Sequence, residues 1–395
     1  MRREPVAGKA AAVDSDTTLP VALGAFFLFG LPDGLLGVAW PSMRADFQVG
    51  LAALGVPLLI LNGCYILTAS FSGVLTNRLG AARALAGALT LYLLGLTAVA
   101  LAPTWLVLIL AMGLLGLCLG ILDAGFNAYA ALRHGSGVMN LLHGLYGVGT
   151  FVGPLAATVI LVSGRGWRPA YLGVAVVALV LVIGIIATRR SWSEREGLPA
   201  LPSRPGGRLW NRALLLSLLS FVCVVGLEAS VGKWAFSVLI GSRHFSPSTA
   251  GILVSLYWGG FTAGRLLAAA TARFSTSGQL LTGSLATSLI GILLFWWNPA
   301  PALGAAALPL IGFGFAALFP LLVALTPQRL ASTRHAVGFQ IAAGGVGAGA
   351  IPALLGVLLA GAGLEALGPA LLLVALVLIG SQFLVARAPR PAASR

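Results

Sequence analysis

Twelve long apolar stretches constrain this 395-residue chain more than any other feature of its sequence. A helix that crosses a bilayer needs about 20 mostly apolar residues, because lipid offers no partners for backbone N–H and C=O groups. The stretches lie at residues 18–41, 51–75, 81–102, 104–132, 137–163, 168–188, 211–240, 247–272, 276–297, 301–326, 336–361 and 366–386. They predict an all-α integral membrane protein with twelve transmembrane helices.

The charged residues agree with this prediction. Only 9% of the residues are charged, against about 25% in soluble domains. The net charge of +14 would suit nucleic-acid binding if the basic residues formed one surface. Instead, 19 of the 24 Lys and Arg residues lie toward one side of the predicted spans, in the loops, tails and span ends. Lys233 lies deep inside a span, and four lie on the other side: Arg44, Arg165, Arg168 and Arg243.

This asymmetry predicts the topology, since Lys and Arg collect in cytoplasmic loops. We expect a multi-pass protein of a bacterial plasma membrane, with both termini cytoplasmic, surrounded by lipid and acting as a monomer. Nucleic acid is not an expected partner.

The predicted spans form two sets of six, separated by the longest polar stretch in the interior of the chain. We expect a cytoplasmic tail at 1–17, a six-helix bundle at 18–188, a cytoplasmic linker at 189–210, a second six-helix bundle at 211–386 and a tail at 387–395.

The two sets of spans are also similar in sequence. Residues recur at an offset of 195 to 198 positions in three pairs of spans, which indicates an internal duplication. The clearest matches are Phe26, Asp33 and Gly37 with Phe221, Glu228 and Gly232, and Pro154 with Pro352.

Four charged side chains fall deep inside the predicted spans, away from the ends: Asp33, Asp123, Glu228 and Lys233. Each costs about 2.5–3.5 kcal/mol at the centre of a span, so each should face a partner or a water-filled cavity. Asp123 and Asn127 share one helix face, where they could contact a solute or pin two helices together by hydrogen bonds. Lys233 could extend to the outer membrane surface or pair with an acid.

Other polar and aromatic residues among apolar neighbours are candidates for solute contact or gating. His143 could relay protons or act as a neutral hydrogen-bonding group. Arg265 could close a gate by pairing with an acid, or could extend to the cytoplasmic surface. The candidate solute contacts are Asn62, Asn127, Asn140, His143, Glu228, Trp234, Trp258 and Gln340, and the candidate gating residues are Arg78 and Arg265.

The sequence offers no arrangement of residues that would serve catalysis. It lacks a Ser/His/Asp set, a His-Glu-x-x-His motif and a phosphate-binding GxxxxGK[ST] loop. Its three cysteines lie in spans without the spacing of metal ligands. We therefore expect no enzyme activity, no cofactor and no bound metal.

Several motifs resemble the major facilitator superfamily, and within it the fucose permease-like sugar:proton symporters. The loop Gly73-Val-Leu-Thr-Asn77-Arg78-Leu-Gly80 is similar to the superfamily's loop between helices 2 and 3, with Asn in place of Asp. Leu122-Asp123-Ala-Gly-Phe-Asn127 and Met139-Asn140-Leu-Leu-His143 resemble the narrower group. The resemblance implies two pseudo-symmetric six-helix bundles that work by alternating access.

The resemblance also implies roles for particular residues. Acids on helices 1 and 4 of that group share proton coupling and solute binding, and these positions correspond to Asp33 and Asp123. His143 falls where the group places a sugar-binding polar residue. This chain departs from the group by carrying Asp rather than Glu on helix 4, and by adding Glu228 and Lys233.

These observations favour a proton-coupled symporter of a sugar or a similar small polar solute. The alternative is a proton-driven exporter of amphiphilic compounds, because the sequence offers few hydrogen-bonding groups for a carbohydrate. A receptor or scaffold without transport activity is a third class, but the sequence shows no sensory or interaction domain beside the spans.

Overall fold

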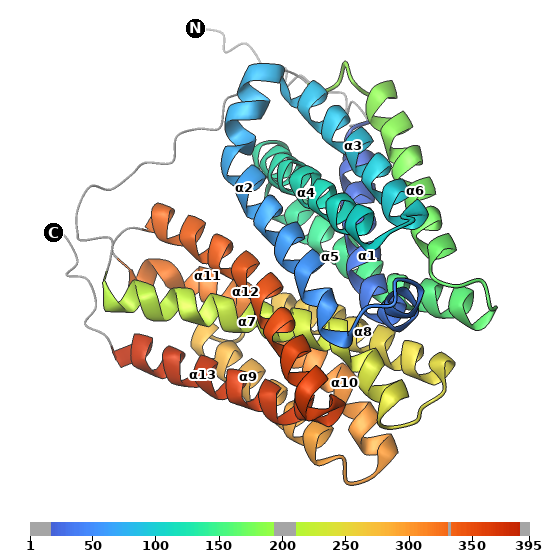
Figure 1. Ribbon diagram of the computed structural model, residues 1–395. Coiled ribbons are helices and arrows are strands. Elements are labelled where there is room, and N and C mark those ends of the chain that lie inside the picture. The colour runs from blue at the N-terminus through green and yellow to red at the C-terminus, as the bar shows by residue number, and fades with distance from the viewer. Residues whose placement is uncertain (1–16, 193–210, 331–332, 388–395) are drawn as a thin grey trace, which may run out of the picture.

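The computed structural model describes residues 17–192, 211–330 and 333–387, and in these ranges it contains helices and no strand (Figure 1). Nearly all of the two predicted tails and most of the predicted linker lie outside the described residues. The described part contains 12 helices long and apolar enough to cross a membrane, which confirms the predicted number of spans.

The first half of the chain contributes six long helices, followed in the second half by seven. The first six are α1 (Leu19–Asp46), α2 (Gly55–Leu79), α3 (Ala81–Leu101), α4 (Trp105–Arg133), α5 (Gly135–Val162) and α6 (Arg168–Ala187). The others are α7 (Arg212–Gly241), α8 (Pro247–Thr271), α9 (Ser277–Trp297), α10 (Pro301–Phe315), α11 (Leu318–Arg329), α12 (Thr333–Ala362) and α13 (Leu367–Arg387). Two short 3₁₀ helices, η1 (Leu51–Leu54) and η2 (Leu364–Ala366), lie in loops.

The tenth predicted span, 301–326, is interrupted where the sequence analysis expects one continuous helix. α10 ends at Phe315 and α11 begins at Leu318. Pro320 has no N–H group, so the carbonyl of Ala316 lacks its usual donor four residues later in the helix. Arg265 Nε on α8 donates to this Ala316 oxygen at 3.3 Å. The break therefore provides an acceptor for a guanidinium group inside the protein.

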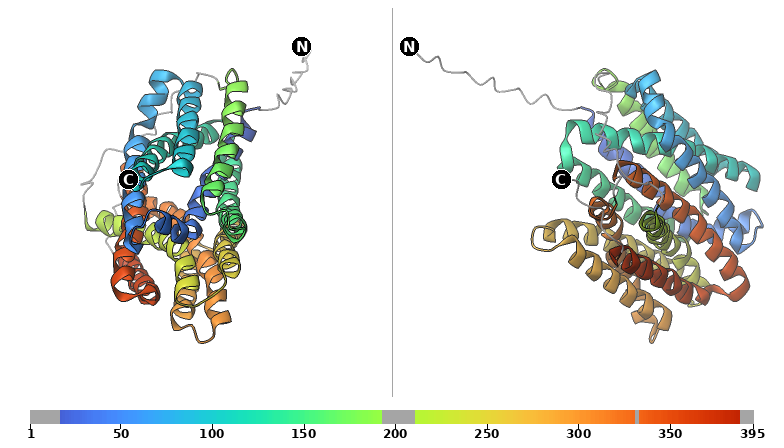
Figure 2. Two further views of the ribbon diagram at one scale, coloured as in Figure 1. Left: turned by 45° about the vertical axis from the view of Figure 1, so that its right-hand side comes forward. Right: turned by 90° about the vertical axis from the view of Figure 1, so that its left-hand side faces the viewer.

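The helices form two bundles that meet along one face (Figures 1 and 2). In the first bundle α1 packs against α5 and α6, and α4 packs against α2 and α3. In the second, α7 packs against α12 and α13, and α10 packs against α8 and α9. The contacts between the bundles are α1 with α7, α2 with α12, and α5 with α8. The last two pairs are equivalent under the internal duplication, as a pseudo-two-fold axis requires.

The bundles come closest where α1 crosses α7. A Cβ atom on Gly37 would collide with the backbone carbonyl oxygen of Gly232. These two glycines are partners in the internal duplication, so the pseudo-two-fold axis passes near their contact. On α2, a Cβ atom on Gly55 would lie 2.9 Å from the Cβ of Ala353 on α12.

The contacts of Gly37 with Gly232 and of Gly55 with Ala353 lie toward the end of the molecule that carries η1 and η2. Toward the other end, where the described chain begins and ends, the bundles diverge (Figure 1). Asn140 and Leu141 on α5 are exposed there.

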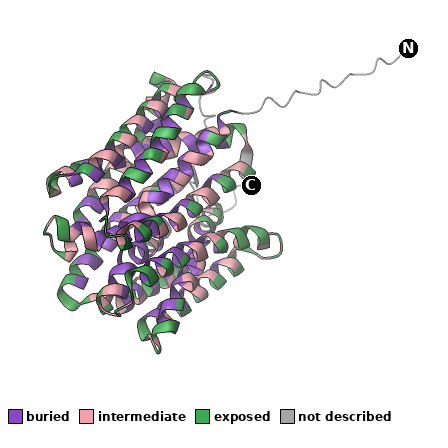
Figure 3. Cartoon of the chain, turned by 90° about the vertical axis from the view of Figure 1, so that its right-hand side faces the viewer, coloured by how far each residue is buried: buried purple, intermediate pink, exposed green. Residues whose placement is uncertain are grey.

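The outer faces of the bundles are exposed, as Figure 3 shows for the helices at the periphery, and they carry many large apolar side chains. On α6, Val176, Val180 and Ile183 are each at least 60% exposed. Such a surface is stable when lipid tails, rather than water, cover it.

The close approach of α1 and α7 can be tested by adding one methyl group. We expect Gly37→Ala to lower the thermal unfolding midpoint of the detergent-purified protein, because overpacking costs about 1–3 kcal/mol. Gly63→Ala on α2 is the matched control, since a Cβ there would meet no atom within 4 Å. Equal midpoints for both variants would contradict this account of the contact.

Candidate functional site

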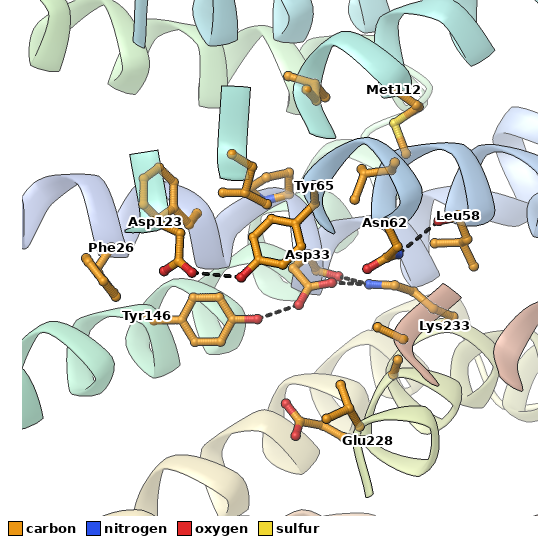
Figure 4. A pocket seen from close by; sticks show the side chains of 18 of the residues that line it. Phe26, Asp33, Leu58, Asn62, Tyr65, Met112, Asp123, Tyr146, Glu228 and Lys233 are labelled. Carbon is orange, nitrogen blue, oxygen red and sulfur yellow. Dashed lines mark hydrogen bonds and ion pairs between the residues drawn. The ribbon is translucent and has the colours of Figure 1, made fainter. Parts of the chain in front are cut away.

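A cavity of about 330 Å³ lies between the two bundles (Figure 4). Its wall is built from helices of both halves, mainly α1, α2, α4 and α5 on one side and α7 and α8 on the other. Seven of the residues predicted from the sequence for coupling, solute contact or gating line it: Asp33, Asn62, Asp123, His143, Glu228, Trp258 and Arg265.

Asp33 on α1 forms an ion pair with Lys233 on α7, and this pair joins the two halves (Figure 4). The Lys233 ammonium contacts Asp33 Oδ1 and also donates to the backbone carbonyl oxygen of Asp33 at 2.6 Å. Tyr146 on α5 donates its hydroxyl to Asp33 Oδ2 at 2.6 Å. The lysine is 3% exposed, so it pairs with an acid rather than extending to the membrane surface.

The sequence around these residues explains why they meet. Gly37 lies one helical turn after Asp33, on the same face of α1. Because neither Gly37 nor Gly232 has a side chain, α7 approaches α1 closely at that point, and a Cβ on Gly37 would lie 3.1 Å from the Cα of Lys233. The lysine side chain then needs to run back only one turn along α1 to reach Asp33.

Asp123 on α4 has two different partners, both in the first bundle. Tyr65 on α2 donates to Asp123 Oδ2 at 2.8 Å, and Asn127 donates to Asp123 Oδ1 at 2.9 Å. The carboxyl group is therefore held by two neutral donors and not by a cation. It links α2 to α4 while one face of it lines the cavity.

Glu228 on α7 lines the cavity without such partners. Its carboxylate accepts no hydrogen bond from the described residues, and Figure 4 shows it on the wall opposite Asp123. The Tyr257 hydroxyl bonds instead to the backbone oxygen of Glu228, at 2.9 Å. The sequence left open whether Lys233 pairs with Glu228, and the structure places the lysine on Asp33.

Trp258 lies next to Glu228 and offers a hydrogen-bond donor. Its six-membered ring packs against Gly232, one turn along α7 from Glu228. Trp258 is 1% exposed, and its indole N–H has no acceptor among the described residues. The indole nitrogen is itself buried, so this donor becomes available to a solute in the cavity only if the ring moves.

The remaining predicted cavity residues are held by local contacts. The His143 ring packs edge-on against Phe26, with 5.2 Å between ring centroids. Asn62 donates to the backbone oxygen of Leu58 at 2.9 Å. Arg265 stacks on the ring of Phe261 at 4.3 Å, in addition to its bond to the Ala316 carbonyl.

Five predicted site residues do not line the cavity. Trp234 is fully buried and donates its indole N–H to the Pro352 carbonyl at 2.9 Å. Gln340 is fully buried and donates to Ser217 at 2.7 Å. Asn127 acts through its bond to Asp123. Asn140 on α5 and Arg78 at the end of α2 are both exposed.

Two tyrosines that the sequence analysis did not select are central to the site. Tyr65 and Tyr146 hold the carboxyl groups of Asp123 and Asp33, respectively. Their spacing along the helices from other selected residues could have identified them. Tyr65 lies three residues after Asn62, and Tyr146 lies three residues after His143, so each shares a face with a selected residue.

A family comparison identifies this architecture. The family model described as Major Facilitator Superfamily matches residues 22–352. The chain belongs to the Major Facilitator Superfamily. It is therefore a multi-pass membrane transporter of small solutes and not an enzyme.

Relatives of known sequence include members from bacteria and animals. An uncharacterised MFS-type transporter of Yersinia pestis is 27% identical over 339 residues, covering 84% of this chain and 86% of the relative. Sodium-dependent glucose transporter 1A of Mus musculus is 24% identical over 374 residues, covering 85% of this chain and 88% of the relative.

Solved structures with this fold include transporters in different conformations. The nucleoside transporter NupG superposes with a TM-score of 0.72 at 15% identity, covering 94% of this chain and 99% of NupG. The MFS transporter FucP in its outward conformation gives 0.62 at 15% identity, covering 92% of this chain and 98% of FucP. A bacterial homologue of Spinster in an inward-facing conformation gives 0.69 at 13% identity, covering 95% and 98%.

The ion pair between the halves predicts that substitutions of its two residues have non-additive effects on stability. Asp33→Asn leaves a buried ammonium without its carboxylate, and Lys233→Met removes the cation, so each should lower the thermal unfolding midpoint. Breaking one partner of a buried pair costs about 3–5 kcal/mol, whereas replacing both is often nearly neutral. The double variant should therefore be more stable than Asp33→Asn alone. A double variant whose loss equals the sum of the two single losses would contradict the pairing.

Proposed function

We propose that this protein is a proton-coupled symporter of a sugar or a similar small polar solute, working by alternating access. The observation that carries the proposal is the Asp33–Lys233 pair, which lies in the wall of the solute-sized cavity and joins the two bundles. Protonation of Asp33 changes the charge of this pair. It therefore also changes how strongly the two bundles are held together.

The coupling of proton and solute follows from the free energy that it costs to separate Asp33 from Lys233. A proton on Asp33 removes the carboxylate charge but leaves the Lys233 ammonium without its counterion in a poorly hydrated wall, which is costly. A solute hydroxyl can accept a hydrogen bond from that ammonium and offset part of the cost. Proton and solute together therefore release the pair more easily than either one alone, which is the behaviour of a symporter.

Asp123 is the second acid in this proposal. Its bonds to Tyr65 and Asn127 keep one carboxyl group at the cavity wall without a neighbouring cation. It can therefore take up a proton without leaving a positive charge unpaired. We propose that Asp33 and Asp123 share the coupling function.

The polar groups of the cavity suit a solute with several hydroxyl groups. Glu228 offers an open acceptor, and Asn62 and His143 add further hydrogen-bonding groups. The cavity volume lies within the range of small-molecule sites, about 300–1,000 Å³. The relative in Mus musculus that is named a glucose transporter supports the same class of solute.

We further propose that both termini are cytoplasmic in a bacterial plasma membrane, on the basis of the 19 basic residues on that side. The bundles at 18–188 and 211–386 would be the two bodies that rock about the cavity in a single monomer, with Arg78 and Arg265 toward the cytoplasmic side.

A second candidate function is proton-driven export of amphiphilic compounds. The observation that favours it is the large apolar share of the cavity wall, which includes Phe26, Phe29, Leu61, Met112 and Phe319. Such a wall can hold an aromatic or aliphatic compound whose polar end reaches the acids.

The coupling proposal can be tested with purified protein in liposomes. With an inward proton gradient, the wild type should accumulate a transported sugar, and both Asp33→Asn and Asp123→Asn should reduce gradient-driven accumulation at least tenfold. Asn77→Asp, in the last turn of α2 and outside the cavity lining, is a control that should keep accumulation near the wild-type level. Unchanged accumulation in both acid variants would overturn the assignment.

The direction of proton flux separates the two functions. In liposomes without an imposed proton gradient, a sugar added outside should carry protons inward if the protein is a symporter, and a pH-sensitive dye inside should report acidification. An amphiphile that drives protons in the direction opposite to its own movement would instead support the exporter.

A further inference from the structure

The Lys233 ammonium lies where a bound monovalent cation would lie. It contacts two oxygens of one residue, the Asp33 carboxylate Oδ1 and the Asp33 backbone carbonyl, the latter at 2.6 Å. Oxygen atoms of carboxylates and backbone carbonyls are the kind of ligands that hold sodium ions in secondary transporters. Here the protein supplies the positive charge itself.

The fold keeps this ammonium in place. Lys233 is 3% exposed, and its backbone is held against α1 by the contact between Gly37 and Gly232. The Asp33 side chain is 39% exposed, so its free edge faces the cavity and water could complete the coordination of an ion. Tyr146 fixes the other carboxylate oxygen and thereby orients the first.

We propose that Lys233 acts as a tethered cation that excludes sodium from Asp33, and that removing its charge creates a sodium site on the same two oxygens. A sodium ion on these oxygens would lie beside the ammonium and be repelled by its like charge in a poorly hydrated site. The ion and the ammonium also compete for the same two acceptors. Occupancy by one therefore excludes the other.

In this role Lys233 determines which cation can act at Asp33. A proton binds directly to a carboxylate oxygen and does not need the carbonyl, so it can act at Asp33 while the lysine remains in place. Sodium requires the position that the ammonium holds. The selection of protons over sodium rests on the proposed function, whereas the exclusion of sodium at Asp33 does not.

The test uses purified full-length protein in detergent and needs neither a solute nor a gradient. Thermal unfolding midpoints are measured in sodium chloride and in choline chloride at equal ionic strength for the wild type, Lys233→Ala, and the Asp33→Asn/Lys233→Ala double variant. We expect sodium to raise the midpoint of Lys233→Ala by several degrees, because a ligand that binds only the folded state stabilises it. The midpoints of the wild type and the double variant should be the same in both salts.

A second measurement keeps the proposal testable if Lys233→Ala is poorly folded. Binding of radioactive sodium by equilibrium dialysis is compared for the wild type and Lys233→Met, whose longer side chain preserves packing. Saturable binding only in the variant supports the tethered cation. Sodium binding or stabilisation in the wild type, or its absence in both charge-removal variants, would overturn it. A wild type that fails to accumulate sugar would overturn the proposed function alone.

Discussion

The contact between α1 and α7 is the constraint on which the rest of the site depends. Gly37 and Gly232 let two backbones approach so closely that a charged residue on one helix reaches a charged residue on the other. Without that approach, Lys233 would be an unpaired ammonium inside a membrane span, which is a state that membrane proteins avoid. The ion pair in turn places a charge-sensitive link at the pseudo-two-fold axis between the two halves.

The three acids of the cavity wall have different surroundings, and these differences suggest different roles in transport. Asp33 has a cation beside it, Asp123 has two neutral donors, and Glu228 has no hydrogen-bond donor among the described residues. A carboxyl group that faces a cavity without partners is free to meet a solute. A carboxyl group such as that of Asp33, whose ion-pair partner lies in the other bundle, can link the binding of proton or solute to movement of the two bundles. The internal duplication thus provided two equivalent acids, and only one of them retains a lysine partner.

Much of the fold follows from the sequence because it depends on local patterns. Apolar length predicts the spans, and the recurrence of Gly37 as Gly232 indicates the two halves. The identity of the lysine's partner could not be predicted, since Asp33 and Lys233 are 200 residues apart and meet only through tertiary packing. Spacing along α7 made Glu228 the nearer candidate.

The same dependence on tertiary packing explains why other predicted site residues do not line the cavity. Trp234 and Gln340 were selected as polar or aromatic residues in apolar helices, but each finds a partner in its own bundle and packs away from the cavity. Polarity alone does not tell which face of a helix meets the cavity. The role of Pro320 in freeing the Ala316 carbonyl for Arg265 likewise requires knowing which helix lies opposite.

The central claim is that an ammonium at position 233 holds the two halves together through Asp33, and chemical restoration of that group tests it most directly. In a variant with the native cysteines replaced, Lys233→Cys can be alkylated with 2-bromoethylamine, which rebuilds a lysine-like side chain, or with bromoethane, which adds no charge. Thermal unfolding is then measured on preparations whose modification is verified by mass spectrometry. The account predicts that only aminoethylation restores stability, and that it fails to do so when Asp33 is also changed to Asn. Equal recovery with both reagents, or recovery without Asp33, would contradict it.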